Sequence, residues 1–442
     1  MARRPAHAPL AVMINGRRVG RLSRAASGAV SFSYDPGWLG WAAAFPVSLS
    51  LPLREEGYAG APVLAVFDNL LPDAEPVRRR VAERVGAAGT DPFSLLAALG
   101  ADCVGALQFL PEDRAAGPVG AVSGRAVTEA EIAQVLRNLA SAPLGLDPDA
   151  EFRISLAGAQ EKTALLRAGG RWMIPQSTTA TTHILKPQIG ALPQGIDLSD
   201  SVENEFLCLR LASALGLPVA RAEIADFEEV RTLVVERFDR LHAADGRLLR
   251  LPQEDFCQAL GVPPARKYQS EGGPGLVEML RLLLGADRPE ADRLQLLRAA
   301  MVFWLLGATD GHAKNFSLFL RPGGRFGLTP LYDVLSAEPA RAAGALRQRQ
   351  FRLAMSAGRR RHYLVDEIMP RHFAQTAAEA GLGPRLLRPL VEELADTGPA
   401  RAEAAVAALP PGFPASLATA VLDGLTRRSA RLALPEGARA GG

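Results

Sequence analysis

The chain has 442 residues, of which 48% are hydrophobic and 22% are charged, a composition typical of a globular protein with two or three domains. Its formal net charge of +3 is too small to indicate nucleic-acid binding by itself. The three cysteines, Cys103, Cys208 and Cys257, are scattered and form no CxxC pair, which argues against a disulfide framework and a structural zinc site.

The sequence gives no convincing targeting or membrane signal. The apolar run at residues 8–14 follows two arginines but stops at Asn15-Gly16, so it does not resemble a signal peptide. The longest uncharged apolar segment, near residues 299–309, is far shorter than the roughly 20 residues that span a bilayer. We therefore expect a soluble, cytoplasmic protein.

Residues 1–112 are predicted to form a small α+β unit without evident chemistry. Residues 9–23 form a hairpin around Asn15-Gly16, a strong two-residue turn signal, and residues 31–34 form a further strand. Residues 47–52 alternate with period two, as a strand does. Residues 67–73 resemble a helix end and turn, and helices are expected at residues 76–86 and 93–99.

Residues 113–150 are predicted to form a linker with one short helix. Breaker-rich stretches at residues 111–118 and 142–149 bound this segment. Between them, Thr128 and Glu131 have the spacing of a capping box that opens a helix over residues 129–140.

A strand-rich block follows. Residues 152–155 and 163–168 are predicted strands joined by the small-residue loop 156–162, and Gly169-Gly170 turns the chain into a third strand. Such a loop can place backbone N–H groups over phosphates. An ordinary hairpin is the alternative, because the loop contains one glycine.

Three later features each allow two interpretations. Lys186, in a strand over residues 182–187, is either an edge residue or a phosphate contact. Glu203 and Glu205, on a helix over residues 201–215, either pair with that lysine as in kinases or form a solvated first turn. Residues 231–240 are either a connector that binds adenine between two lobes or a buried strand that ends at the surface.

The strongest chemical motif follows an apolar helix predicted over residues 289–309. Asp310 and Asn315 have the spacing of the protein-kinase catalytic loop, in which the aspartate accepts the substrate proton and the asparagine holds magnesium. A predicted hairpin over residues 315–330 then leads to Asp333. An amide oxygen and a carboxylate brought together by a hairpin suit Mg²⁺. Thr309, Gly311 and Ala313 are interpreted as structural spacers.

Residues 341–362 are rich in arginine and contain no acid. They form either a solvated basic loop or a contact for an anionic partner, such as an acidic protein, tRNA or DNA phosphates. Residues 364–440 are predicted to form a helical tail.

In these motifs the sequence resembles the HipA family of serine/threonine kinases from bacterial type II toxin–antitoxin systems. The resemblance covers nearly the whole chain and is weakest at residues 336–361. Its matching stretches are residues 48–52, 68–73, 154–166, 197–205, 235–240, 251–255, 267–268, 272–275, 307–315 and 332–333.

The resemblance implies an α+β, two-lobed protein-kinase-like fold, with the N-terminal unit as an extra subdomain, a β-rich N-lobe at residues 151–240 and a helical C-lobe at residues 241–442. It implies that Asp310 is the catalytic base, that Asn315 and Asp333 bind Mg²⁺, and that Lys186 binds the ATP phosphates. Further ATP contacts are expected at Ala157, Gly158, Ala159, Gln160, Glu161, Lys162, Glu236, Arg237, Phe238, His312 and Lys314.

The family also implies a function. The chain is expected to phosphorylate a Ser or Thr of a host protein with Mg-ATP, for which glutamyl-tRNA synthetase is the best-known family substrate, and so to inhibit translation. Autophosphorylation of Ser155 would inactivate it, and a HipB-like helix-turn-helix antitoxin dimer would neutralise it and carry most operator DNA contacts. The alternatives are a catalytically silent corepressor that acts with a DNA-binding partner, and a small-molecule or lipid kinase.

Overall fold

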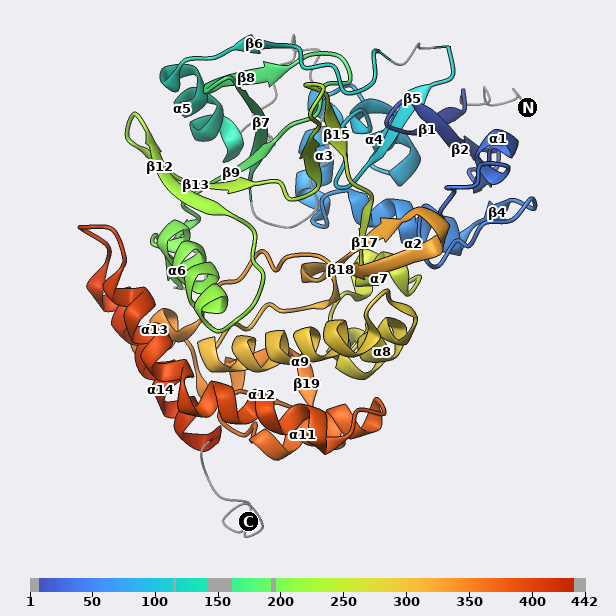
Figure 1. Cartoon of the computed structure of the whole chain (residues 1–442). Helices are drawn as coiled ribbons and strands as arrows, with labels where there is room; N and C mark the ends of the chain where they lie inside the picture. Colours follow the sequence, from blue (N-terminus) through green and yellow to red (C-terminus); the bar gives the residue numbers. More distant parts are fainter. Residues whose placement is uncertain (1–7, 114–116, 141–160, 192–195, 433–442) are drawn as a thin grey trace. The chain divides into compact units, whose positions relative to one another are not determined.

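The computed structural model describes residues 8–113, 117–140, 161–191 and 196–432. The strand predicted at residues 152–155, the breaker-rich stretch 142–149 and most of the loop 156–162 lie outside these ranges. The chain divides into two compact units. The first comprises Met1–Pro187, Ala225–Ala265 and Ser317–Phe326, and the second comprises Gln188–Ile224, Arg266–Phe316 and Gly327–Gly442. We describe each unit by itself (Figure 1).

The first unit begins with a five-stranded sheet. The predicted hairpin around Asn15-Gly16 is confirmed, because both turn residues have the positive φ, 44° and 79°, that a type I′ turn requires. The predicted strand at residues 31–34 is also confirmed. In spatial order the strands are β4 (Tyr58–Ala59), β3 (Val30–Tyr34), β2 (Arg17–Arg24), β1 (Leu10–Ile14) and β5 (Leu107–Pro111).

Short helices accompany this sheet, and the two helices predicted near residues 76–86 and 93–99 are confirmed. The Asp91 side chain accepts a hydrogen bond from the Ser94 N–H and so caps the second of them. The helices are α1 (Pro36–Leu39), α2 (Ala61–Phe67), α3 (Glu75–Arg84) and α4 (Pro92–Leu99), and α7 (Phe256–Ala259) comes later in the chain.

The strand suggested by the alternation at residues 47–52 is wrong, because this segment is a turn. Side chains, and no neighbouring strand, satisfy its polar groups. The Leu49 N–H donates to Glu254 Oε1 at 2.8 Å, and the Ser48 and Ser50 hydroxyls both donate to the Gln258 carbonyl. The alternation therefore reports side chains that anchor the turn.

A six-stranded sheet with a helix packed against it forms a further part of the core of this unit. Helix α5 (Glu129–Arg137) opens with the predicted capping box of Thr128 and Glu131. Its buried Ile132 and Leu136 join Leu165 and Val234 of the sheet in one apolar cluster. The spatial order is β12 (Ala222–Phe227), β13 (Val230–Glu236), β9 (His183–Pro187), β7 (Thr163–Ala168), β8 (Arg171–Pro175) and β6 (Gly124–Ala126).

Two smaller sheets also contain strands of this unit. The hairpin predicted after Asn315 is confirmed by β17 (Ser317–Arg321) and β18 (Arg325–Leu328). Strand β17 also pairs with β16 (Gln253–Asp255), while β14 (Arg240–His242) pairs with β15 (Leu248–Arg250).

The second unit is mainly helical. Its central helix α9 (Pro289–Leu306) is buried over most of its last turns, and Trp304 donates its indole N–H to the Val365 carbonyl at 3.0 Å. The predicted helical tail is confirmed as far as Leu432. The helices are α6 (Ser201–Ala214), α8 (Leu276–Leu282), α9 (Pro289–Leu306), α10 (Glu338–Ala342), α11 (Pro370–Glu379), α12 (Pro384–Asp396), α13 (Gly398–Ala407) and α14 (Ala415–Leu432).

Two short strand pairs also belong to the second unit. They are β10 (Gly190–Ala191) with β11 (Asp197–Leu198), and β19 (Arg352–Ala357) with β20 (His362–Leu364). The arginine-rich segment 341–362 is therefore more than a solvated loop, because it contains strand β19 and the turn that leads into β20.

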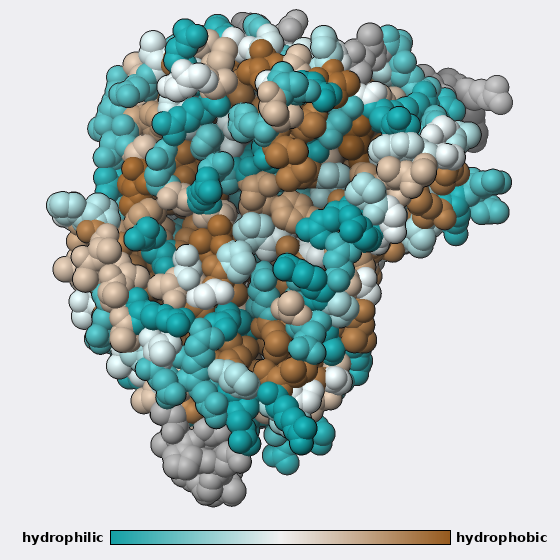
Figure 2. Space-filling view, in the orientation of Figure 1, coloured by the Kyte–Doolittle hydropathy of each residue, from teal (hydrophilic) through white to brown (hydrophobic). Residues whose placement is uncertain are grey.

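In the part of the chain that the structure describes, no helix is long and apolar enough to cross a membrane. On the face drawn in Figure 2, hydrophilic and hydrophobic residues are interspersed.

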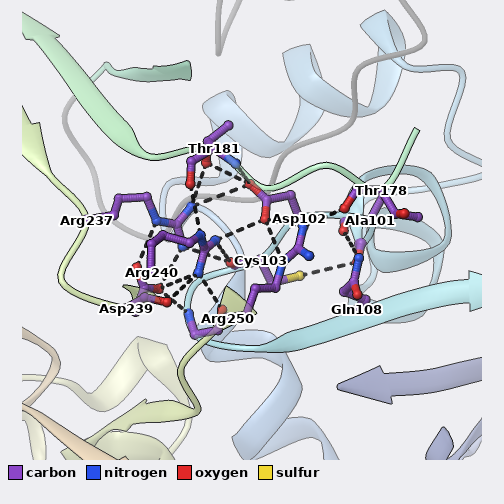
Figure 3. A network of polar contacts seen from close by, with 12 residues as sticks. Ala101, Asp102, Cys103, Gln108, Thr178, Thr181, Arg237, Asp239, Arg240 and Arg250 are labelled. Carbon is purple, nitrogen blue, oxygen red and sulfur yellow. Dashed lines mark hydrogen bonds and ion pairs between the residues drawn. The ribbon is translucent and has the colours of Figure 1, made fainter. Parts of the chain in front are cut away.

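A buried ionic network joins the N-terminal subdomain to the six-stranded sheet of the same unit (Figure 3). Asp102 lies 3.0 Å from the Arg240 guanidinium and 2.9 Å from that of Arg250, and Thr181 donates its hydroxyl proton to the same carboxylate. The side chains of Asp102 and Arg240 are each 2% exposed. Burial favours a raised pKa for Asp102, but the guanidinium groups of Arg240, Arg250 and Arg237 hold that pKa below its usual value.

Asp239 forms the second acidic centre of this network. It accepts from the Arg237 guanidinium at 2.8 Å and from the Gly105 N–H at 2.7 Å. Since Gly105 and Asp102 belong to the N-terminal subdomain, the contacts of both carboxylates cross the same internal boundary. Each charged group of this network therefore has an opposite charge and further hydrogen bonds, which is the condition for tolerating such groups in a protein interior.

Glu254, on β16, is a further buried acid that contacts the N-terminal subdomain. It is 1% exposed. The Leu49 N–H donates a hydrogen bond to it, and the Ser48 hydroxyl is a second hydrogen-bond donor beside it. Burial raises its pKa to about 8, so the folded protein holds this carboxyl protonated near neutral pH.

We predict that Asp102→Ala lowers the free energy of unfolding by about 3–5 kcal/mol, because it leaves buried guanidinium groups without their carboxylate. Urea titration monitored by circular dichroism measures the loss. The matched control is Asp245→Ala, which removes an ion pair to Arg247 whose two side chains are 53% and 49% exposed; its expected cost is below about 1 kcal/mol. Equal losses in the two variants would contradict this account.

We predict that Glu254→Gln is more stable than the parent at pH 8. The folded state binds a proton that the unfolded state releases between pH 4.5 and about 8, so the parent loses stability as pH rises through that window. Glutamine keeps an oxygen for the Leu49 N–H and does not ionise. Thermal melts from pH 5 to pH 9 should show the variant's advantage growing to on the order of 2 kcal/mol with rising pH. A pH-independent difference would refute the assignment.

Candidate active site

The loop that carries Asp310 begins where α9 ends. Gly307 takes the left-handed conformation, with φ of 61°, that commonly ends a helix, and the Ala308 N–H bonds back to the Phe303 carbonyl at 2.8 Å. Gly311 then packs against the Phe303 ring, since a Cβ at this position would lie 2.5 Å from it. The interpretation of Gly311 as a spacer is therefore sound, because a larger residue would push the loop away from α9.

The Asp310 carboxylate is exposed but held. The Tyr268 hydroxyl donates a 2.6 Å hydrogen bond to Asp310 Oδ1, while Oδ2 lies 3.9 Å from His312 Nε2. The Tyr268 and His312 rings meet edge to face, with centroids 4.9 Å apart. Because the Asp310 side chain remains 60% exposed, it can approach a substrate in a fixed orientation.

Asn315 is oriented by the same loop. Its Nδ2 donates to the Asp310 carbonyl at 2.7 Å, which leaves the amide oxygen as the atom available to a cation. Its backbone N–H donates to the His312 carbonyl at 2.9 Å. His312, Lys314 and Asn315 are all buried, with 4–6% exposure, so the loop is a packed element.

The segment with Asp333 is tied to this loop. The Tyr332 hydroxyl donates a hydrogen bond to the Lys314 carbonyl at 2.9 Å. Asp333 directly follows Tyr332, and Asn315 directly follows Lys314, so this hydrogen bond ties together the two segments that carry them. Asp333 has a φ of 59°, a left-handed conformation that non-glycine residues adopt rarely and that is enriched at functional sites.

These donors fit magnesium. Mg²⁺ prefers hard oxygen ligands and is commonly bound by one or two protein groups together with phosphate oxygens and water. Asn315 and Asp333 offer one amide oxygen and one carboxylate. Among the described residues, no group of three or more His, Cys, Asp and Glu side chains is placed to hold a metal.

Lys186 is not an edge residue. It lies on β9, between β13 and β7 in the six-stranded sheet, opposite Leu233, and is 5% exposed. The edge interpretation is therefore wrong. Burial of this lysine inside the sheet is consistent with a specific role for its ammonium group, and the phosphate contact stays a prediction.

The segment predicted to meet adenine follows β13. Glu236 is exposed at its end, and the Phe238 ring packs edge to face against Phe319 at 5.8 Å. The Arg237 guanidinium is committed elsewhere, since it donates to the Thr181 hydroxyl and to the Cys103 carbonyl in the buried network. Its backbone N–H is also bonded, so an ATP contact at Arg237 is restricted to its carbonyl oxygen.

The phosphate-loop prediction is only partly within the described chain. Glu161 lies 3.5 Å from the Arg80 guanidinium, and Lys162 is 8% exposed. Ser155 and the remaining predicted loop residues, Ala157, Gly158, Ala159 and Gln160, lie outside the described residues.

The two glutamates of α6 are buried, which corrects the interpretation of a solvated first turn. Glu203 and Glu205 are 4% and 2% exposed, and Glu203 accepts a 2.7 Å hydrogen bond from Gln188 Nε2. Asp200 stands at the N-terminus of α6, but its side chain accepts no capping hydrogen bond. Pairing of either glutamate with Lys186 stays a prediction.

Sequence reasoning missed the roles of Tyr268 and Asp102. Tyr268 lies 42 residues before Asp310 in a turn-rich loop, and no periodicity links the two. Asp102 lies in a subdomain that showed no chemistry. The only available signal was the cluster of Arg237, Asp239 and Arg240 after an apolar strand, which needs partners if buried.

Comparisons with known proteins agree with one another. A family model described as the HipA-like C-terminal domain matches residues 154–402, and one described as the HipA N-terminal domain matches residues 10–110. A Sinorhizobium fredii protein named "Putative kinase Y4mE" is 39% identical over 392 residues, which is 88% of this chain and 89% of that protein. The "Serine/threonine-protein kinase toxin HipA" of Shewanella oneidensis is 30% identical over 306 residues, 66% of this chain and 67% of that protein.

A solved structure gives the same result. It is titled as the Shewanella oneidensis toxin–antitoxin complex of HipA, HipB and operator DNA, and its matching chain has a TM-score of 0.79 and 27% identity. The match covers 96% of this chain and 97% of that one. It confirms the α+β, kinase-like, two-lobed fold class expected from the sequence.

Proposed function

This chain belongs to the HipA family, and from that premise we propose that it is a Mg-ATP-dependent serine/threonine protein kinase. One observation carries the proposal. The Tyr268 hydroxyl holds the exposed carboxylate of Asp310, and the loop that carries Asp310 also orients Asn315. An acid presented in one orientation beside a candidate metal ligand is what phosphoryl transfer to a hydroxyl requires.

The proposed mechanism gives each residue a task. Asp310 accepts a hydrogen bond from the acceptor Ser or Thr hydroxyl, aligns it with the γ-phosphate and takes its proton as the bond forms. Mg²⁺, when bound by Asn315 and Asp333, would neutralise charge on the phosphates. Lys186 would contact the phosphates from β9, and Lys314 would stabilise the charge that develops on the transferred group.

The remaining ATP contacts follow the sequence prediction. Glu236, the Arg237 carbonyl and Phe238 would meet the adenine, and residues 157–162 would cover the phosphates. His312 packs on Tyr268 and keeps the Asp310 loop in place. Phosphorylation of Ser155 would add about 1.5 to 2 negative charges to a site that binds the charge of ATP, and so would inactivate the enzyme.

The toxin–antitoxin context defines the proposed partners. The structural relative is titled with HipB and operator DNA, which supports a HipB-like helix-turn-helix antitoxin dimer as the partner of this chain and an operator contact mainly through that antitoxin. The acceptor would be a host protein whose phosphorylation inhibits translation, with an aminoacyl-tRNA synthetase, such as glutamyl-tRNA synthetase, as the first candidate.

We predict that Asp310→Asn lowers the rate of phosphate transfer on the order of 10²–10⁴-fold, because asparagine keeps the shape but cannot take the proton. The measurement is transfer of radiolabelled γ-phosphate by the purified full chain to proteins of a cell lysate. Asp423→Asn, an exposed aspartate on α14, is the matched control and should transfer at the parent rate. Parent-like transfer by a folded Asp310 variant would overturn the assignment. ATP binding without transfer in the parent itself would favour a silent corepressor.

We predict that Tyr268→Phe lowers kcat about tenfold and leaves KM for ATP unchanged, because the hydroxyl orients the base and loses a hydrogen bond to a charged group. Steady-state kinetics at varied ATP separates the two parameters. Tyr58→Phe, which removes a hydroxyl bonded to the Pro52 carbonyl in the N-terminal subdomain, is the control. An unchanged kcat would show that Tyr268 does not position Asp310.

A further inference from the structure

Six exposed arginines gather on and beside the hairpin β19–β20. We call them the arginine face; they are Arg347, Arg349, Arg352, Arg359, Arg360 and Arg361. No ion pair within the described residues involves any of the six. Arg352 lies over the Tyr363 ring, with 4.9 Å between its guanidinium carbon and the ring centroid. Arg341, in contrast to the six, pairs with Asp366 at 2.9 Å, so its charge is compensated within the fold.

The sequence around the arginine face contains no acidic residue that would balance its positive charge. From Pro339 to Val365 it contains neither aspartate nor glutamate. Like charges held together at a surface repel one another and raise the local concentration of anions. A fold that keeps these side chains in solvent, while pairing neighbouring Arg341, leaves them available to an anionic partner.

The hairpin that carries this face is fixed to the catalytic loop. Gln269 Oε1 accepts hydrogen bonds from the Ser356 N–H at 2.7 Å and from its hydroxyl at 2.9 Å, and Gln269 directly follows the Tyr268 that holds Asp310. On the other side, Phe351 packs against Gly307, where a Cβ would lie 2.8 Å from its ring. The arginine face and the proposed base are therefore parts of one packed assembly.

The hairpin also sets the spacing of the face. Arg352 stands at one end of β19, and Gly358 begins the turn that presents Arg359, Arg360 and Arg361 at the other. The five residue steps of β19 span about 17 Å, the length of an extended peptide of about five residues.

From these observations, and resting on the proposed kinase function, we propose that the arginine face docks an acidic stretch of the acceptor protein next to the Ser or Thr presented to Asp310. Guanidinium groups bind carboxylates through paired hydrogen bonds. A protein segment is favoured over nucleic acid because the hairpin is bonded through Ser356 and Gln269 to the loop that must receive the acceptor.

The test removes two charges from the turn. Arg359→Gln/Arg360→Gln is compared with Arg171→Gln/Arg210→Gln, which removes two exposed arginines that likewise have no ion pair among the described residues. Fluorescence anisotropy of the full chain measures binding of a labelled serine peptide flanked by glutamates, of its alanine-flanked counterpart, and of a labelled DNA duplex. We expect the turn variant to bind the acidic peptide about tenfold more weakly and the control to bind it as the parent does.

Phosphorylation of the same peptides distinguishes the two proposals. If both hold, the turn variant raises KM for the acidic peptide and leaves kcat unchanged. If peptide binding depends on the arginines but no variant or parent phosphorylates protein or peptide, docking stands and the kinase function fails. Equal binding of the acidic and the alanine-flanked peptide by the parent overturns the docking proposal. The proposal also fails if the parent binds the DNA duplex but not the acidic peptide, and only the turn variant loses duplex binding.

Discussion

The buried contact of Asp102 with Arg240 and Arg250 is the constraint on which the first unit depends. Moving two carboxylates and three guanidinium groups out of water costs several kcal/mol per ion, and only their mutual attraction with further hydrogen bonds offsets that cost. All members of the network must therefore be in place together. This is possible only when the N-terminal subdomain packs against the segment that follows β13. Arg237 and Asp239 enclose Phe238 in the sequence, so the same contacts fix the segment proposed to receive adenine.

The second unit holds the exposed carboxylate of Asp310 in one orientation. Gly307 ends α9 sharply, Gly311 allows the loop to pack on Phe303, and Tyr268 restrains the carboxylate from a distant part of the chain. Asn204 of α6 holds the segment after Asp333, since it exchanges two 2.8 Å hydrogen bonds with the Ser336 backbone. Rigid support of this kind lets electrostatic interactions act on a transition state without a cost of rearrangement.

The sequence predicted what local physics controls. Asn15-Gly16 specifies its hairpin by backbone conformation alone, Thr128 and Glu131 cap their helix within four residues, and the turn at residues 321–324 sets the β17–β18 hairpin. It failed where a distant partner decides. The alternating residues 47–52 form a turn and not a strand, because Leu49 and Ser50 hydrogen-bond to Glu254 and Gln258, some 200 residues away. Burial of Glu203 and the interior position of Lys186 depend on neighbours that no local pattern reveals. The Tyr268 contact with Asp310 is of the same kind.

The most direct test of the account concerns the Asn315 and Asp333 oxygens. Crystals of the full chain grown with a non-hydrolysable ATP analogue and Mn²⁺, which shares the oxygen preference of Mg²⁺, would locate the metal by anomalous diffraction. The account predicts a peak within about 2.5 Å of both Asn315 Oδ1 and the Asp333 carboxylate, with the adenine against Phe238. A peak that contacts neither residue, with the analogue bound elsewhere, would contradict the proposed phosphoryl-transfer site.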